Sequence, residues 1–106
     1  MDFVKRLNET LHIGDDWARA YKVIGDVDFT DARGVCKIRT YKGEVILEPD
    51  CVVDGDRLIV TISSEQSLGI NRAFTRCKYD VFLITKEQTI KLVMGSMDII
   101  PDVSMH

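Results

Sequence analysis

Side chains that carry acid–base or nucleophilic catalysis are few in this chain, and they stand far apart. It has two histidines, His12 and His106, and His106 is the last residue. A Ser–His–Asp or Cys–His site needs its histidine held beside the nucleophile by the fold. Both histidines fall in segments expected at the mobile ends of the chain. There is no G-x-S-x-G, H-E-x-x-H or phosphate-binding glycine loop. We therefore predict a protein that is not an enzyme.

Clustered carboxylates are the candidates for a metal site. Asp26, Asp28 and Asp31 share one polar stretch, and calcium prefers sets of loop carboxylates. Their spacing does not fit the D-x-[DN]-x-[DN]-G pattern with its distal glutamate. Aspartate is also selected by turns, because its side chain bonds to nearby backbone amides. We expect turn residues here, with no metal and no other cofactor.

The cysteines offer two interpretations. Cys36, Cys51 and Cys77 are an odd number without C-x-x-C spacing, which disfavours a zinc site and a disulfide framework. Cys36 and Cys77 fall on expected inward strand positions. They could bridge two sheets, as in antibody domains, or remain buried thiols that pack as small apolar groups. The lone Trp17 does not follow Cys36 on its strand, so the antibody pattern is incomplete and thiols are favoured.

Length and composition predict one compact domain. The chain has 106 residues, of which 45% are hydrophobic and 29% charged. It can therefore form a core without disulfide bonds or a bound metal ion. A formal net charge of −3 argues against nucleic acid, which needs a basic patch. No apolar run is long enough to span a membrane, and the N-terminus lacks a signal-peptide core. We expect synthesis in a cytoplasm, with no membrane or nucleic-acid partner.

Short apolar runs separated by turn signals predict about seven or eight strands, which is typical of a β-sandwich or barrel. Asp54-Gly55 is a strong hairpin signal. Ser64, as a cap, opens one short helical turn near 64–68, which Gly69 stops. We expect an N-terminal arm over residues 1–9 and a single domain over 10–104. The strands are expected near 17–24, 35–41, 44–47, 51–53, 57–62, 77–84 and 89–94, with short extended pieces near 10–13 and 97–100.

The strand over 77–84 is apolar on both faces at its far end. Inward positions on this and the other strands, which alternate in side-chain direction, are expected to form the core: Trp17, Ile38, Leu58, Val60, Ile62, Tyr79, Val81, Leu83 and Leu92. Phe82, Ile84 and Val93 are expected to form an outward apolar set. Such patches are rarely left in water. The arm residues Phe3, Val4 and Leu7 are expected to cover them, from the same chain or from a neighbouring subunit.

Several motifs occur in a characteristic order along residues 10 to 104. They are Gly14-Asp15-Asp16-Trp17, Asp28-Phe29-Thr30-Asp31-Ala32, Ile38-Arg39, Leu58 to Gln66, Cys77-Lys78-Tyr79-Asp80-Val81, Leu92-Val93-Met94-Gly95 and Asp102-Val103-Ser104. Their order resembles the small immunoglobulin-like β-sandwich of tailed bacteriophages, found in the N-terminal domain of baseplate upper proteins and in collar proteins that hold side tail fibres.

The resemblance implies an immunoglobulin-like antiparallel sandwich and a non-enzymatic virion structural protein. Such a subunit of the tail, baseplate, collar or connector would oligomerise, in a ring if the contact is heterologous, and would bind other tail or connector proteins. It would be located in the virion, and in the host cytoplasm during assembly. An alternative is a monomeric β-sandwich module that binds carbohydrate or a surface ligand. It would need exposed aromatic residues in a groove, for which Tyr41, Phe74 and Phe82 are the candidates.

Overall fold

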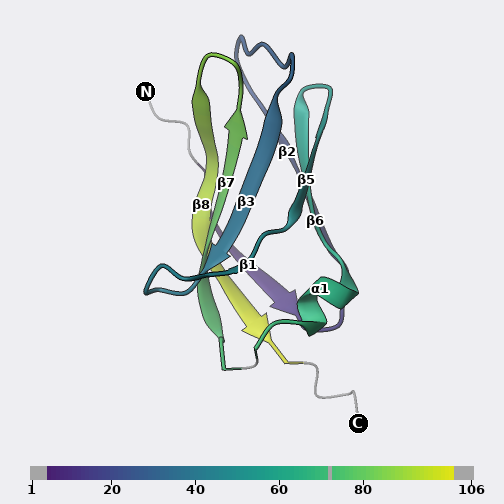
Figure 1. The fold of residues 1–106 in the computed structure, drawn as a ribbon, viewed down its shortest axis with the longest axis vertical. Helices are drawn as coiled ribbons and strands as arrows, with labels where there is room; N and C mark the ends of the chain where they lie inside the picture. The colour runs from purple at the N-terminus through teal and green to yellow at the C-terminus, as the bar shows by residue number, and fades with distance from the viewer. Residues whose placement is uncertain (1–4, 72, 102–106) are drawn as a thin grey trace.

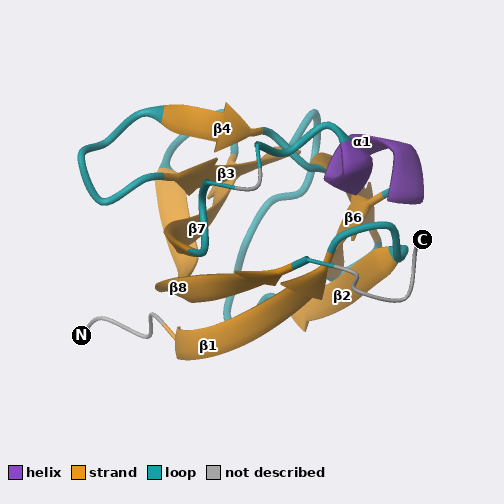
Figure 2. Cartoon of the chain, turned by 90° about the horizontal axis from the view of Figure 1, so that it is seen from below, coloured by secondary structure: helices purple, strands orange, loops and turns teal. Residues whose placement is uncertain are grey.

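Two β-sheets pack face to face in the computed structural model, which describes residues 5–71 and 73–101 (Figure 1). The expected all-β sandwich is confirmed, with sheets of five and three strands and one short helix. Seen along the long axis, β4, β3, β7, β8 and β1 follow one another in one layer, and β2 and β6 lie across from it (Figure 2). In chain order the elements are β1 (Lys5–His12), β2 (Trp17–Lys22), β3 (Arg33–Arg39), β4 (Val45–Leu47), β5 (Asp50–Asp54), β6 (Arg57–Ile62), α1 (Ser64–Leu68), β7 (Arg76–Ile84) and β8 (Thr89–Ile100).

The strand order is immunoglobulin-like. It runs β1-β8-β7-β3-β4 in one sheet and β2-β6-β5 in the other. Strands β2, β6 and β5 thus take the places of B, E and D, and β3, β7 and β8 those of C, F and G. All pairs are antiparallel except β1 with β8, which run parallel. The expected purely antiparallel arrangement therefore needs this one correction.

The N-terminal strand is longer than the sequence predicts. Residues 5–9, expected in an arm, belong to β1, where Leu7, Glu9 and Leu11 alternate toward the second sheet. The alternation is not apparent in the sequence, because the charged residue Glu9 occupies one of the inward positions. Its carboxylate accepts hydrogen bonds from the Arg19 guanidinium on β2, at 2.8 and 3.1 Å, so a charged residue is tolerated at an inward edge position. Phe3 and Val4 lie outside the described residues.

A β-bulge in the β7–β8 hairpin reverses the expected facing of one segment. Val81 pairs with Val93, but Phe82 pairs with Lys91, which leaves Leu92 as an extra residue. Beyond it, Val93 points inward and is 0% exposed. The prediction that Val93 faces outward is therefore wrong. Leu92, expected in the core, is half-buried and packs against it.

Gly95 was expected to interrupt the chain between two strands, but β8 runs through it without a break. A Cβ at this position would lie 1.7 Å from the backbone oxygen of Leu7. Only a residue without a side chain lets β1 approach β8 this closely. The glycine is therefore part of the pairing between the first and last strands.

The core contains the other predicted inward residues. Those that are buried are Trp17, Ile38, Leu58, Val60, Ile62, Tyr79, Val81 and Leu83. Trp17 meets Tyr79 edge to face, with ring centroids 5.9 Å apart. The hydroxyl groups of Tyr21 on β2 and Tyr79 on β7 hydrogen-bond to each other, which links the two sheets. Burial raises the pKa of Tyr21 to about 12 and raises that of Tyr79 further.

All three cysteines are free. Cys36 and Cys77 are buried on β3 and β7, which are neighbours in the same sheet, so a bridge between sheets does not form. Burial raises the pKa of both thiols, and it raises that of the half-buried Cys51 to about 11. These thiols pack as small apolar groups in their neutral form.

The turn predictions are largely correct. Asp54 ends β5 and Gly55 follows at φ +61°, which forms the expected hairpin. The helix covers 64–68 as predicted, but its cap is Ser63. The Ser63 side chain accepts from the Gln66 amide at 3.1 Å, and the Gln66 side chain accepts from the Ser63 amide at 2.9 Å. This reciprocal capping box favours Ser63 over the predicted Ser64.

Candidate functional site

The outer face of the five-stranded sheet keeps part of the expected apolar set. Phe82 and Ile84 point outward from β7 and are half-buried, and Val35 of β3 lies directly opposite Phe82. The Lys91 ammonium lies 5.4 Å from the centroid of the Phe82 ring, a cation–π contact. The predicted interface residue Leu7 faces inward and packs against the core. The apolar part of this face therefore consists of Val35, Phe82 and Ile84.

Cations dominate the rest of this surface, which we call the basic face. It comprises the outward charged residues Arg6, Lys37, Arg39, Arg76, Lys78, Asp80 and Asp98, and leaves aside Arg33 and Lys91, which lie opposite Ile84 and Phe82 at the apolar end of the sheet. Five positive and two negative side chains give +3, although the whole chain carries −3. Opposite charges must therefore be concentrated elsewhere on the molecule.

Ion pairing on the basic face is incomplete. Arg76 donates to Asp98 at 3.0 Å, and this bond raises the pKa of the guanidinium. Asp80 lies 3.9 Å from Arg39, beyond hydrogen-bond distance. Arg39 and Lys78 stand directly opposite each other on adjacent strands, an arrangement of like charges that destabilises a sheet. Such a pair indicates a surface suited to a negatively charged partner.

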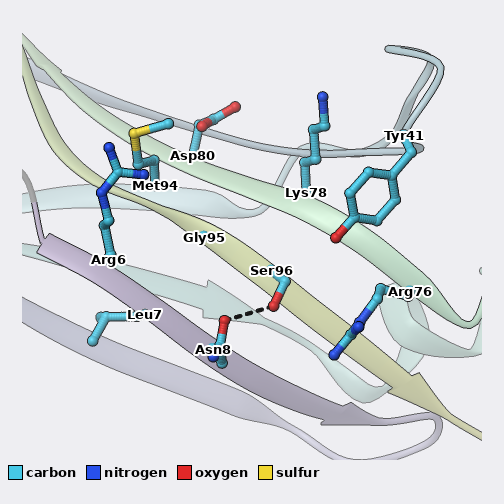
Figure 3. Close-up of a pocket in the computed structure, with 10 residues that line it drawn as sticks. All are labelled: Arg6, Leu7, Asn8, Tyr41, Arg76, Lys78, Asp80, Met94, Gly95 and Ser96. Carbon is cyan, nitrogen blue, oxygen red and sulfur yellow. Dashed lines mark hydrogen bonds between the residues drawn. The ribbon is translucent and has the colours of Figure 1, made fainter.

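A hollow of about 590 Å³ opens on the basic face (Figure 3). Its floor is β8 at Met94, Gly95 and Ser96, where the glycine adds no side chain. Arg6 rises from β1 on one side, and Lys78 and Tyr41 stand together on the other. No salt bridge is found for Arg6 or Lys78 among the residues that the structure describes. The hollow thus presents two available cations above a partly apolar floor.

Other polar side chains that line the hollow already have partners within the chain. The Ser96 hydroxyl donates to Asn8 Oδ1 at 2.7 Å, as the dashed line in Figure 3 marks. The Lys78 ammonium lies 5.5 Å from the centroid of the Tyr41 ring, which covers part of that aromatic surface. An occupant would therefore meet charge and apolar contact more than free hydrogen-bonding groups.

Comparison with protein-family models and with curated proteins finds no match. The site must accordingly be interpreted from its own chemistry. Across 5–71 and 73–101, no three His, Cys, Asp or Glu side chains gather as metal ligands, and no helix is long and apolar enough to cross a membrane. His12 is exposed at the end of β1, while His106 lies outside the described residues.

Two of the three carboxylates considered for calcium, Asp28 and Asp31, make contacts within or beside their loop. Asp28 accepts from the Thr30 amide at 2.9 Å, and its hydrogen bonds with Thr30 lower the pKa of this carboxyl. Asp31 adopts φ +54° and lies 3.3 Å from the Lys86 ammonium. These contacts are those of side chains that shape a loop, as the sequence predicts.

The aromatic candidates for sugar binding do not share a groove. Tyr41 is 56% exposed at the edge of the hollow, whereas Phe74 packs against the core and Phe82 sits at the apolar end of the sheet. The sequence could not reveal the hollow, because its walls come from β1, β7, β8 and the β3–β4 turn. Only the strand order brings them together.

A second depression, an apolar groove, is lined by residues of both sheets. It has a volume of about 680 Å³ and runs between the end of β2 and the start of β8. Val93, expected on the outer face, lines its inner wall together with Leu92. Ile24, at its rim, is 87% exposed. This isoleucine is a candidate contact residue that alternation along the strand did not single out.

Proposed function

We propose that this chain is a non-enzymatic structural subunit of a bacteriophage virion, which self-associates and anchors other virion proteins. The observation that carries the proposal is the outer face of the five-stranded sheet. It joins half-exposed Phe82 and Ile84 to a surface of excess positive charge, a combination suited to a protein partner. The immunoglobulin-like strand order and the ordered motifs support a phage tail, baseplate, collar or connector protein.

Light scattering after size-exclusion chromatography, over a range of protein concentrations, tests self-association. We expect a mass above that of a monomer, falling on dilution or at high salt because surface charges contribute. A monomer at every concentration would contradict the self-association. Mass spectrometry of purified particles from a host that carries the gene tests the virion assignment. Absence of the protein from the particles would refute that part alone.

A monomeric carbohydrate-binding module is the second candidate. One observation favours it: Tyr41 is 56% exposed beside the hollow, with Asn8 and Ser96 as polar neighbours. A glycan array tests it directly. Binding that disappears in Tyr41→Ala, while Phe74→Ala changes only stability, would favour this function over self-assembly.

A further inference from the structure

We propose that copies of this chain associate head to tail, with the loop end of one copy docked on the basic face of the next. The loop end consists of the β2–β3 loop (residues 23–32), the β5–β6 turn and the β7–β8 turn. This proposal rests on the self-association in the proposed function and specifies the two surfaces that make it. The partner at the basic face is therefore a second copy.

The three loops lie together at one end of the sandwich, at the top of Figure 1. The Val23 amide donates to the Asp56 carbonyl at 2.8 Å, which joins the β2–β3 loop to the β5–β6 turn. The Lys86 ammonium lies 3.3 Å from Asp31, which joins the same loop to the β7–β8 turn. They therefore form one continuous surface.

This surface is rich in carboxylates. They are Asp26, Asp28, Asp31, Asp54, Asp56 and Glu87. Asp31 has its partner in Lys86, and Asp56 lies 3.8 Å from Lys22. Within the described chain, the other four are not found in a salt bridge. Against these six carboxylates stand four cations in or beside the loops, Lys22, Arg33, Arg57 and Lys86, so the loop end keeps a net charge of −2, whereas the basic face has an excess of positive charge.

The loop end also offers an apolar contact. Ile24 is 87% exposed, and Gly25 follows in the left-handed region at φ +109°, so the chain turns sharply before Asp26. An isoleucine and a carboxylate therefore sit at one tip. The hollow provides the complement, with Met94 on its floor and the cations Arg6 and Lys78 at its sides.

Charge also decides the symmetry of the contact. In a two-fold contact made by the basic face alone, Arg6, Arg39 and Lys78 of one copy would meet cations of the other. Such a like-charge interface is unfavourable. A contact between two different surfaces avoids this repulsion, and repetition of it builds a ring or a filament. Head-to-tail association is therefore favoured over a symmetric dimer.

The experiment uses two charge-reversal variants of the full chain. Lys78→Glu alters only the basic face, and Asp26→Lys alters only the loop end. Each residue is exposed, and unchanged near-ultraviolet circular dichroism would show that each variant folds. Sedimentation velocity measures association of each variant alone and of an equimolar mixture. We expect each variant alone to associate at least about tenfold more weakly than the wild type.

Mixing is the decisive measurement. The unaltered face of Asp26→Lys can still bind the unaltered loop end of Lys78→Glu, so we expect the mixture to recover association. Ile24→Ser should weaken wild-type association, whereas Val52→Ser, at a 59% exposed position on the other sheet, should not. Glu65→Lys on α1, which also replaces an acidic residue by lysine, is the matched control for Asp26→Lys and should leave association unchanged.

Three outcomes overturn the proposal, and they differ in what they leave standing. Wild-type association that persists in Lys78→Glu and in Asp26→Lys would refute the head-to-tail contact and leave self-assembly standing. An equimolar mixture of the two variants that does not associate would also refute the head-to-tail contact. A wild-type protein that is monomeric throughout would refute both this contact and the self-association of the proposed function.

Discussion

Removing either hydroxyl of the Tyr21–Tyr79 pair tests how the two sheets are held together. Each hydroxyl finds its hydrogen bond in the other, so a phenylalanine on one side leaves a polar group without a partner on the other. Such a group costs about 1–3 kcal/mol in the free energy of unfolding. Tyr79 is 0% exposed and Tyr21 is 8% exposed, so the two orphaned hydroxyls are not equivalent.

The difference in burial sets the order of the effects. Tyr21→Phe leaves the wholly buried Tyr79 hydroxyl unpaired and should cost about 2–3 kcal/mol, near the top of the range. Tyr79→Phe leaves the Tyr21 hydroxyl, which is closer to water, and should cost about 1–2 kcal/mol. The double variant has no orphaned hydroxyl and should be less destabilised than the two costs combined.

Urea unfolding followed by the fluorescence of Trp17, whose ring touches Tyr79, measures all three variants. Tyr41→Phe, at an exposed tyrosine, is the control and should change stability by less than about 0.5 kcal/mol. Additive losses in the double variant would refute the reasoning. So would a larger loss in Tyr79→Phe than in Tyr21→Phe.

Three further predictions concern stability and association. Gly95→Ala should lower the melting temperature and cost about 3 kcal/mol or more, since its Cβ would collide with the Leu7 backbone; an unchanged melting temperature would contradict this. Phe82→Asp should leave the monomer folded but reduce association, whereas Val81→Asp, buried in the core, should prevent folding. Equal unfolding of both by circular dichroism would mean that Phe82 is covered within one chain. Finally, burial raises the pKa of Tyr21 from 10.0 to about 12, so the native state holds its proton more tightly than the unfolded state. The Tyr21 contribution to stability should be constant below about pH 10 and fall between pH 10 and 12 by up to about 1.4 kcal/mol per pH unit, so chemical denaturation of Tyr21→Phe should show a smaller fall over this window than the wild type.

Local signals predicted the parts of the fold that depend on neighbouring residues. Asp54-Gly55 specifies a hairpin because both central turn positions favour a positive φ. Gly69 and a serine N-cap delimit the helix for similarly local reasons, although the cap is Ser63 and not the predicted Ser64. The alternation over 77–84 identified the strand β7, and the same periodicity identified the strands β3 and β8, although not their pairing with β7.

Features that depend on distant partners were missed. Glu9 breaks the apolar pattern of β1, and only Arg19 on another strand explains why it is tolerated there. The bulge at Leu92 changes the facing of Val93 without any change in composition. The hollow combines Arg6 with Lys78, which are far apart in sequence. No pattern along the chain could bring these two cations together before the strand order was known.

The pairing of β1 with β8 has a consequence for synthesis. Lys5 lies opposite Val93, 88 positions later, and Asn8 and Ser96 are separated by the same interval. The first strand therefore has to wait, during translation, until β8 has left the ribosome. Until then one edge of the nascent sheet stays open, and that is when unwanted joining to other chains is easiest. Producing this protein at a slow rate or at low temperature should therefore raise the yield of soluble material.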